Sequence, residues 1–147
     1  MSQPAASTAA LKVKDYMNSS VSTLKPEDRL LDADLLIRRA SVRHLPVLSD
    51  GRLVGLLTER DVRRFAPSIL HSTPDEYNEI FEATVVGTVM TKDVKTIRPD
   101  ASLAEAAALL YSERLGCLPV VDGDELVGIL TRTDILRFAN DVLNGTR

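Results

Sequence analysis

The sequence predicts an α/β (α+β) fold in which two tandem β-α-β-β-α units pack with pseudo-twofold symmetry, with a short helical insertion between them. The first observation is an internal repeat: the second half matches the first at an offset of 73 residues, the separation of Met17 from Met90. The second is the same order of strand, helix, hairpin and helix signals in both halves. The third is that two copies are too few for a solenoid, so they should pack as a pair.

The repeat also sets the expected domain boundaries. We expect a flexible leader over residues 1–11, the first repeat over 12–66, an insertion over 67–85, the second repeat over 86–140 and a tail over 141–147. A chain of 147 residues suffices for two halves that share one core, but it is short for two independent domains.

Each repeat opens with a β-prone run and a helix. In the first copy the run covers residues 21–24, and a helix should follow from Asp28 or Arg29. In the second copy the corresponding helix should begin after Ser102 and continue to Gly116.

A hairpin and a second helix complete each repeat. In the first copy we expect strands over residues 45–48 and 53–57, and their nearly continuous apolar runs indicate a sheet covered on more than one face. The last helix should run over residues 59–66, and its counterpart from residue 133 towards residue 143.

The insertion carries a helix signal of its own. Thr73, Pro74 and Glu76 place a cap residue, a proline and an acid where the start of a helix prefers them. Tyr77 and Phe81 then lie on one apolar stripe, so we expect an extra short helix.

Composition is typical of a soluble globular protein. The chain is 44% hydrophobic and 27% charged, its net charge is −3, and it has one cysteine, which rules out an internal disulfide. A mildly acidic balance gives no general attraction to nucleic acid or to an anionic membrane, and no apolar stretch is long enough to span a bilayer. We therefore expect a cytoplasmic protein without nucleic-acid or membrane partners.

No catalytic or metal site is predicted. The chain has two histidines and no spacing typical of a zinc site. Cys117 has no neighbour in sequence that could activate its thiol, and glycine fingerprints of nucleotide-hydrolysing or dinucleotide folds do not occur. We therefore expect a non-catalytic protein that requires no cofactor.

A duplicated Gly-x-x-Thr-x-x-Asp segment lies where a strand passes into a helix. It places Thr58 and Asp61 in the first copy, and Thr131 and Asp134 in the second. A helix N-terminus favours phosphate, a hydroxyl adds a hydrogen bond, and a carboxylate can bridge ribose hydroxyls. The same pattern is also typical of a plain helix cap, so both interpretations stay open.

Basic residues accompany these motifs. Arg60 and Arg132 lie inside them, while Arg43 and His44 could add positive charge near the first site. Basic residues on helices are more often simply solvated, which makes these four weaker candidates for phosphate contacts.

The chain resembles a tandem pair of CBS domains, often called a Bateman module, over residues 12–140. The resemblance is carried by Met17 and Met90, the Leu-Pro-Val strands and the two Leu-Val-Gly-x-Leu-Thr-x-x-Asp segments. The insertion is also similar to stand-alone bacterial CBS proteins of the acetoin-utilisation type.

The resemblance implies two clefts between the repeats that bind AMP, ADP or ATP as a regulatory ligand. Carried over by position, Asp61 and Asp134 bind ribose, and Thr58, Thr131, Arg60 and Arg132 bind phosphate. The implied adenine pockets are lined by Val21, Ser22, Thr23, Leu45, Val94, Lys95, Thr96 and Leu118.

The leading hypothesis is an energy sensor that binds adenine nucleotides and passes the ligand state to an unknown regulated protein or through a homodimer. Two alternatives remain: a structural dimerisation adaptor that binds no nucleotide, and a sensor of S-adenosylmethionine. An enzyme acting on a nucleotide is disfavoured, because no acid–base pair or metal site accompanies the binding motif.

Overall fold

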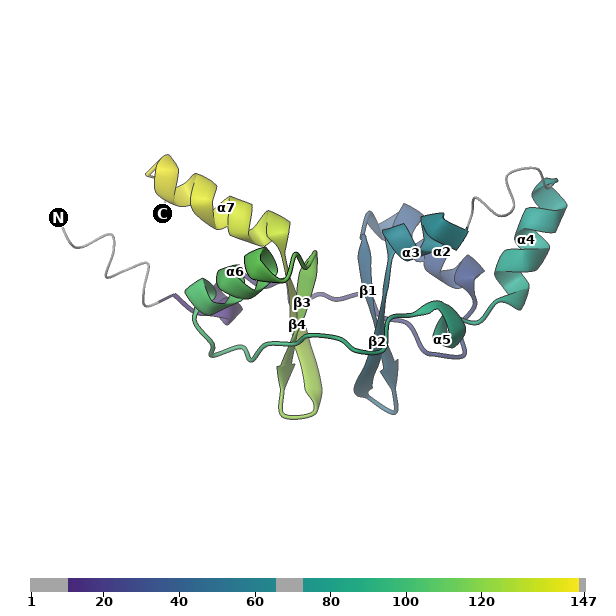
Figure 1. Ribbon diagram of the computed structural model, residues 1–147, viewed down its shortest axis with the longest axis horizontal. Coiled ribbons are helices and arrows are strands. Elements are labelled where there is room, and N and C mark those ends of the chain that lie inside the picture. Colours follow the sequence, from purple (N-terminus) through teal and green to yellow (C-terminus); the bar gives the residue numbers. More distant parts are fainter. Residues whose placement is uncertain (1–10, 66–72, 146–147) are drawn as a thin grey trace. The chain divides into compact units, whose positions relative to one another are not determined.

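The computed structural model describes residues 11–65 and 73–145, which fall into two compact units. One unit is Val21–Val94, and the other joins residues 11–20 to residues 95–145. Each unit contains one hairpin and the helices that pack on it (Figure 1). The predicted leader up to residue 10 and the predicted helix end at residue 66 lie outside the described residues.

Both predicted hairpins are confirmed. The antiparallel pairs are β1 (His44–Ser49) with β2 (Arg52–Thr58), and β3 (Cys117–Asp122) with β4 (Glu125–Thr131). In the first turn Asp50 and Gly51 both take left-handed backbone, with φ of 52° and 80°, as a type I′ hairpin turn requires. Both hairpins shift register at the same place, after Val47 and after Val120.

The predicted helices are also present. They are α2 (Leu30–Ala40), α3 (Glu59–Phe65) and α4 (Pro74–Ala83) in the first unit, and α6 (Leu103–Ser112) and α7 (Arg132–Leu143) in the second. Arg29 is the N-cap of α2, one of the two residues expected there. The prediction that α6 continues to Gly116 was wrong, because Arg114 turns into left-handed backbone (φ 55°) soon after Ser112.

Two short helices were not predicted, the 3-10 helix η1 (Val13–Asp15) and α5 (Val86–Val89). The insertion helix α4 has the predicted start: Glu76 N donates to Thr73 Oγ1 (3.2 Å), and Thr73 N donates to Glu76 Oε1 (2.9 Å). This bonding lowers the pKa of Glu76. Tyr77 stacks on Phe81 at a ring-centroid distance of 4.3 Å, so the apolar stripe joins the first core.

Each unit has its own apolar core. Completely buried side chains fill both of them: Leu30, Leu45, Val47, Leu57 and Phe81 in the first, and Val13, Leu118, Val120 and Leu130 in the second.

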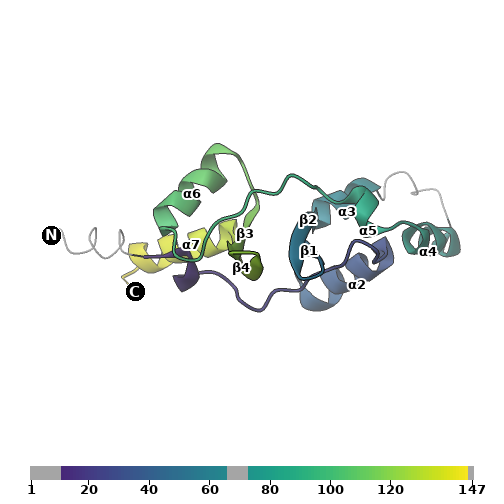
Figure 2. The same ribbon diagram turned by 90° about the horizontal axis from the view of Figure 1, so that it is seen from below.

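Short chain segments pair with both edges of each hairpin. On one edge Leu24 pairs in parallel with Val47, and Ile97 with Val120, so the expected strand at residues 21–24 is reduced to one bridging residue. On the other edge Thr91 pairs with β2 and Asn18 pairs with β4. The segment that precedes the first repeat therefore completes the sheet of the second, as Figure 2 shows for the N-terminal segment near β4.

A methionine packs onto a strand glycine beside each of these outer pairs. Met90 lies over Gly55, and Met17 lies over Gly128, where an added Cβ would approach Met17 Sδ to 2.6 Å and Asn18 O to 3.0 Å. The methionines are therefore packing residues, and the protein itself covers the two strand glycines.

Replacing Gly128 with alanine should lower the free energy of unfolding by about 1–3 kcal/mol, because the new Cβ meets Met17 and the Asn18 carbonyl. Urea denaturation measures this loss, and its size should shrink in the Met17→Ala background, where the side-chain clash is removed. Gly87→Ala is the control, since its Cβ would meet Pro26 O at the milder distance of 3.2 Å. A Gly128→Ala protein as stable as the wild type contradicts the packing argument.

Candidate functional site

The first copy of the motif forms a complete capping box at the start of α3. Asp61 N donates to Thr58 Oγ1 (3.1 Å), and Thr58 N donates to Asp61 Oδ2 (2.9 Å). Both side chains are half-buried, and Asp61 Oδ1 takes no part in the box. The capping interpretation is therefore confirmed for this copy, and it leaves one carboxylate oxygen for another donor.

The second copy forms the same box at the start of α7, with a further contact. Thr131 N donates to Asp134 Oδ2 (2.8 Å), Thr131 Oγ1 lies 3.2 Å from the same oxygen, and Asp134 N lies 3.4 Å from Thr131 Oγ1. Asp134 Oδ1 accepts a hydrogen bond from Arg137 Nη2 at 3.3 Å, which is also an ion pair. The two carboxylates thus share a cap but differ in their neighbours.

The start of each hairpin lies beside its motif. His44 pairs with Thr58 across β1 and β2, and Cys117 pairs with Thr131 across β3 and β4. The next residues along β1 and β3, Leu45 and Leu118, are completely buried, so only their main chain can contact a ligand.

The predicted adenine-pocket segments run towards the same strand starts. Leu24 pairs in parallel with β1, so the preceding residues Val21, Ser22 and Thr23 lead towards the beginning of that strand. In the second unit Ile97 pairs in parallel with β3, and Lys95 and Thr96 precede it in the same way. Val94 is the last residue of the other compact unit.

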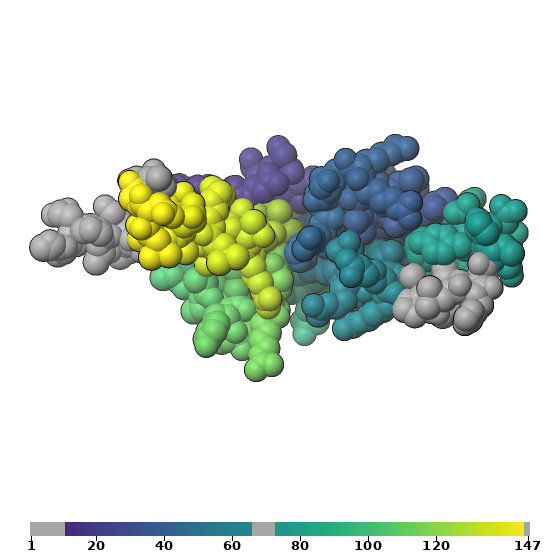
Figure 3. All heavy atoms as spheres, turned by 90° about the horizontal axis from the view of Figure 1, so that it is seen from above, coloured from purple at the N-terminus to yellow at the C-terminus, as the bar shows by residue number. Residues whose placement is uncertain are grey.

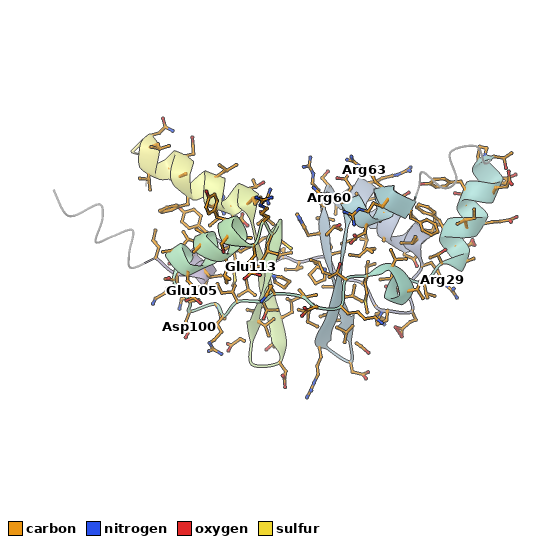
Figure 4. All side chains as sticks on the ribbon, in the orientation of Figure 1. Arg29, Arg60, Arg63, Asp100, Glu105 and Glu113 are labelled. Atoms are coloured by element: carbon orange, nitrogen blue, oxygen red, sulfur yellow. The ribbon has the colours of Figure 1, made fainter. Side chains whose placement is uncertain are left out.

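The basic candidates differ in how they are engaged. Arg60 is exposed on the first turn of α3 (Figure 4), where it could reach an anion at the helix start. Arg132 Nε donates to the Leu115 carbonyl (2.8 Å), which fixes its guanidinium near the start of α7. Arg43 lies 3.9 Å from Glu59, whose carboxylate also pairs with Arg63 at 3.2 Å, so Arg43 is partly neutralised. His44 is half-buried at the start of β1.

A separate groove in the first unit lies away from these motifs, against α4. Its lining is Arg29, Asp75, Asn78, Glu79, Glu82 and Ala83. Three carboxylates against one arginine make this lining unfavourable for phosphate, so it is not a candidate nucleotide site.

Chemistry-bearing side chains are otherwise sparse. Among the described residues no group of three or more histidine, cysteine or acidic side chains could hold a metal ion. Burial raises the pKa of the Cys117 thiol to about 12, so this cysteine packs as an unreactive apolar side chain. In the part of the chain that the structure describes, no helix has both the length and the apolar character needed to cross a bilayer.

Sequence reasoning missed three residues around Asp134. Arg137 Nη2 donates to the Tyr16 carbonyl (2.9 Å), and its guanidinium lies 4.8 Å from the centroid of the Tyr16 ring. The Tyr16 hydroxyl donates to Asp141 Oδ2 (2.9 Å). The spacing of Arg137 three positions after Asp134 was the available signal, but nothing local in the sequence connects it to Tyr16.

The chain belongs to the CBS domain family. The CBS domain model matches residues 13–68 and again residues 86–141. The prediction of a tandem CBS pair is therefore confirmed, and the chain is a non-catalytic CBS pair.

Individual proteins of the family resemble the chain over most of its length. A crystal structure of a protein described as an acetoin utilization protein, AcuB, from Vibrio cholerae is 33% identical, with a TM-score of 0.77 over 91% of this chain and 93% of that chain. A crystal structure of CBSX2 in complex with AMP is 30% identical, with a TM-score of 0.75 over 90% and 98%. The CBS domain-containing protein YhcV of Bacillus subtilis is 32% identical over 84% of this chain and 81% of its own length.

Other curated relatives are much longer. The chain spans 46% of the protein MJ1225 of Methanocaldococcus jannaschii and 24% of the inosine-5'-monophosphate dehydrogenase of that organism. Likeness to those proteins therefore covers a part of each.

Stability should fall in alkaline solution because of Cys117. Its pKa is raised from 9.0 to about 12 in the folded chain, so the unfolded chain loses the thiol proton first as the pH rises. Between those two values this group lowers the free energy of unfolding by up to ~1.4 kcal/mol per pH unit, and below them it has no effect. Urea denaturation of wild type and Cys117→Ala at pH 8 and pH 10.5 isolates the contribution of Cys117, because all other groups titrate in both proteins. If the free energy of unfolding falls equally in the two proteins between these pH values, the assignment to Cys117 is wrong.

Proposed function

We propose that the chain is a regulatory module that binds adenine nucleotides through its two Thr-x-x-Asp motifs. AMP is the first ligand to test, and ADP and ATP share the adenosine and phosphate groups that the motif suits. The single observation that carries the proposal is the duplicated motif, held in both repeats as a capping box at the start of a helix.

Physical chemistry supports this assignment at both sites. The capping box fixes the carboxylate beside the first helical turn, where the N–H groups and the helix dipole favour an anion. Asp61 Oδ1 lies outside the box and can accept from ribose hydroxyls, while Arg60 can meet a phosphate. The AMP complex of the similar protein CBSX2 supports the choice of ligand.

The proposed consequence of nucleotide binding is a change in the affinity of the module for a partner protein. Ligand control requires that the nucleotide binds two states of the protein with different affinity. A sensor of cellular adenylates acting in the cytoplasm on a regulated protein fits this scheme, and the partner would be identified by its response to the bound nucleotide.

Calorimetric titration with AMP should reveal binding in the wild type, and Asp61→Asn and Asp134→Asn should each remove one site. Each substitution removes the carboxylate charge that accepts from the ribose, for a loss of about tenfold or more in affinity. Parallel titrations with ADP, ATP and S-adenosylmethionine identify the preferred ligand.

The control for lost capping is Glu76→Gln, which makes the same change in the capping box of α4, away from both motifs. It should leave AMP binding unchanged. If none of the adenosine compounds binds, the nucleotide proposal is wrong and the structural-adaptor hypothesis replaces it.

We also propose that the module forms a homodimer. Over its described residues the second unit exposes four large apolar side chains, Tyr111 on α6 (88%), and Leu136 (68%), Val142 (44%) and Leu143 (83%) on α7, and such side chains favour a covered interface. Figure 3 shows the surface of α7, in yellow, on the face turned to the viewer.

Analytical ultracentrifugation should show a dimer that Leu136→Glu weakens by tenfold or more, on the order of 1.4 kcal/mol. Leu35→Glu is the matched control, because Leu35 is also exposed but lies on α2 of the other unit. A monomeric wild type, or equal effects of both substitutions, would argue against α7 as the interface.

A further inference from the structure

The N-terminal segment, residues 11–18, is held to the second repeat by main-chain hydrogen bonds. Val13 N donates to Ala101 O (2.9 Å), and Asn18 and Ile129 exchange two hydrogen bonds of 2.9 Å each. Tyr16 in the middle of this segment is 1% exposed, and its ring packs edge-on against Phe138 of α7 at 5.5 Å. The segment is therefore an integral part of the second unit.

Arg137 connects this segment to the motif carboxylate. Its Nη2 donates both to Asp134 Oδ1 (3.3 Å) and to the Tyr16 carbonyl (2.9 Å), while the guanidinium covers the Tyr16 ring. One side chain thus contacts the proposed ribose-binding group and the main chain of the docked segment. A movement of either group changes the contacts of the other.

In the part of the first repeat that the structure describes, no equivalent connection is present. At the positions 73 residues away, Arg64 stands for Arg137 and Val89 stands for Tyr16. Valine has neither a ring for the guanidinium nor a hydroxyl for a carboxylate, and over residues 11–65 and 73–145 no hydrogen bond or ion pair joins Arg64 to Asp61. The sequence repeat is symmetric, but this network is confined to the second copy.

We propose that Arg137 is a positioning residue that couples Asp134 to the docking of the N-terminal segment, so that the second nucleotide site responds to the segment and the first does not. The proposal rests on the proposed function for its ligand. Coupling is reciprocal: a docked segment raises nucleotide affinity at Asp134, and bound nucleotide stabilises docking by the same factor.

Amide hydrogen exchange of the ligand-free chain tests the connection without any nucleotide. Arg137→Gln should speed exchange at Asn18 and Ile129 by about fivefold or more, while the equivalent amides Leu56 and Thr91 stay unchanged. Arg64→Gln is the matched control and should alter neither pair. Equal acceleration at both pairs, or none at Asn18, overturns the proposal.

A double-mutant comparison separates coupling from simple loss of stability. If Arg137 acts through Asp134, then Asp134→Asn should speed exchange at Asn18 in the wild type but add little in the Arg137→Gln background. Additive effects of the two substitutions overturn the coupling.

AMP is the probe for the ligand arm. In the wild type AMP should slow exchange at Asn18, and in Arg137→Gln it should not, with calorimetry showing about fivefold weaker binding at one of two sites. If AMP binds both proteins identically, the inference fails while the proposed function stands. If the wild type binds no AMP, the proposed function fails, and the ligand-free exchange still decides whether Arg137 makes the connection.

Discussion

Reciprocal main-chain pairing between linking segments and hairpins is the constraint on which the rest of the structure depends. Asn18 completes the sheet of the second repeat through Ile129, and Thr91 completes that of the first through Leu56. A side chain on the neighbouring strand glycine would collide with the methionine and the carbonyl of the arriving segment. The glycine of the Gly-x-x-Thr-x-x-Asp motif is therefore required for packing. The Thr and Asp that follow are positioned by a strand that is hydrogen-bonded along both of its edges.

The Thr and Asp of each motif have a structural role as a helix cap, beside the binding role proposed for them. The capping box uses Oδ2 of both aspartates and satisfies N–H groups that the helix start leaves unpaired. It also immobilises the carboxylate before any ligand arrives, and a fixed acceptor loses less conformational entropy on binding. For Asp61 a helix cap and the proposed ribose contact are therefore compatible, because the cap uses Oδ2 and leaves Oδ1 for a ligand; at Asp134 a ligand would share Oδ1 with Arg137.

Local patterns predicted the hairpins and the start of α4, because the turn residues Asp50 and Gly51 and the Thr73 capping box act within a few residues of themselves. The predicted end of α6 was wrong, because the helix was expected to end at Gly116 and the left-handed residue is Arg114. The pairing of Asn18 with β4 and of Thr91 with β2 could not be predicted, because no local sequence pattern marks it. The Arg137–Tyr16 contact joins residues 121 positions apart, and periodicity carries no information about such a pair.

Duplication gave both repeats the same motif, but equal motifs do not make equal sites. The strength with which a carboxylate accepts a new hydrogen bond depends on the donors that it already has. Asp134 Oδ1 has the Arg137 guanidinium at 3.3 Å, whereas Asp61 uses only Oδ2 in its cap. Val89 stands in the first unit at the position equivalent to Tyr16, so the aromatic ring that supports Arg137 has no counterpart there. An arginine that pairs with a carboxylate neutralises part of its charge, so the carboxylate binds a further donor more weakly. The arginine also blocks some of the directions from which a further donor can approach. If both motifs bind nucleotide as proposed, the two sites should differ in affinity, because among the described residues Asp134 is tied through Arg137 to the N-terminal segment and Asp61 has no such tie. Under the proposed coupling, such a module would hold a ligand at the site of Asp61 and report a change through the site of Asp134.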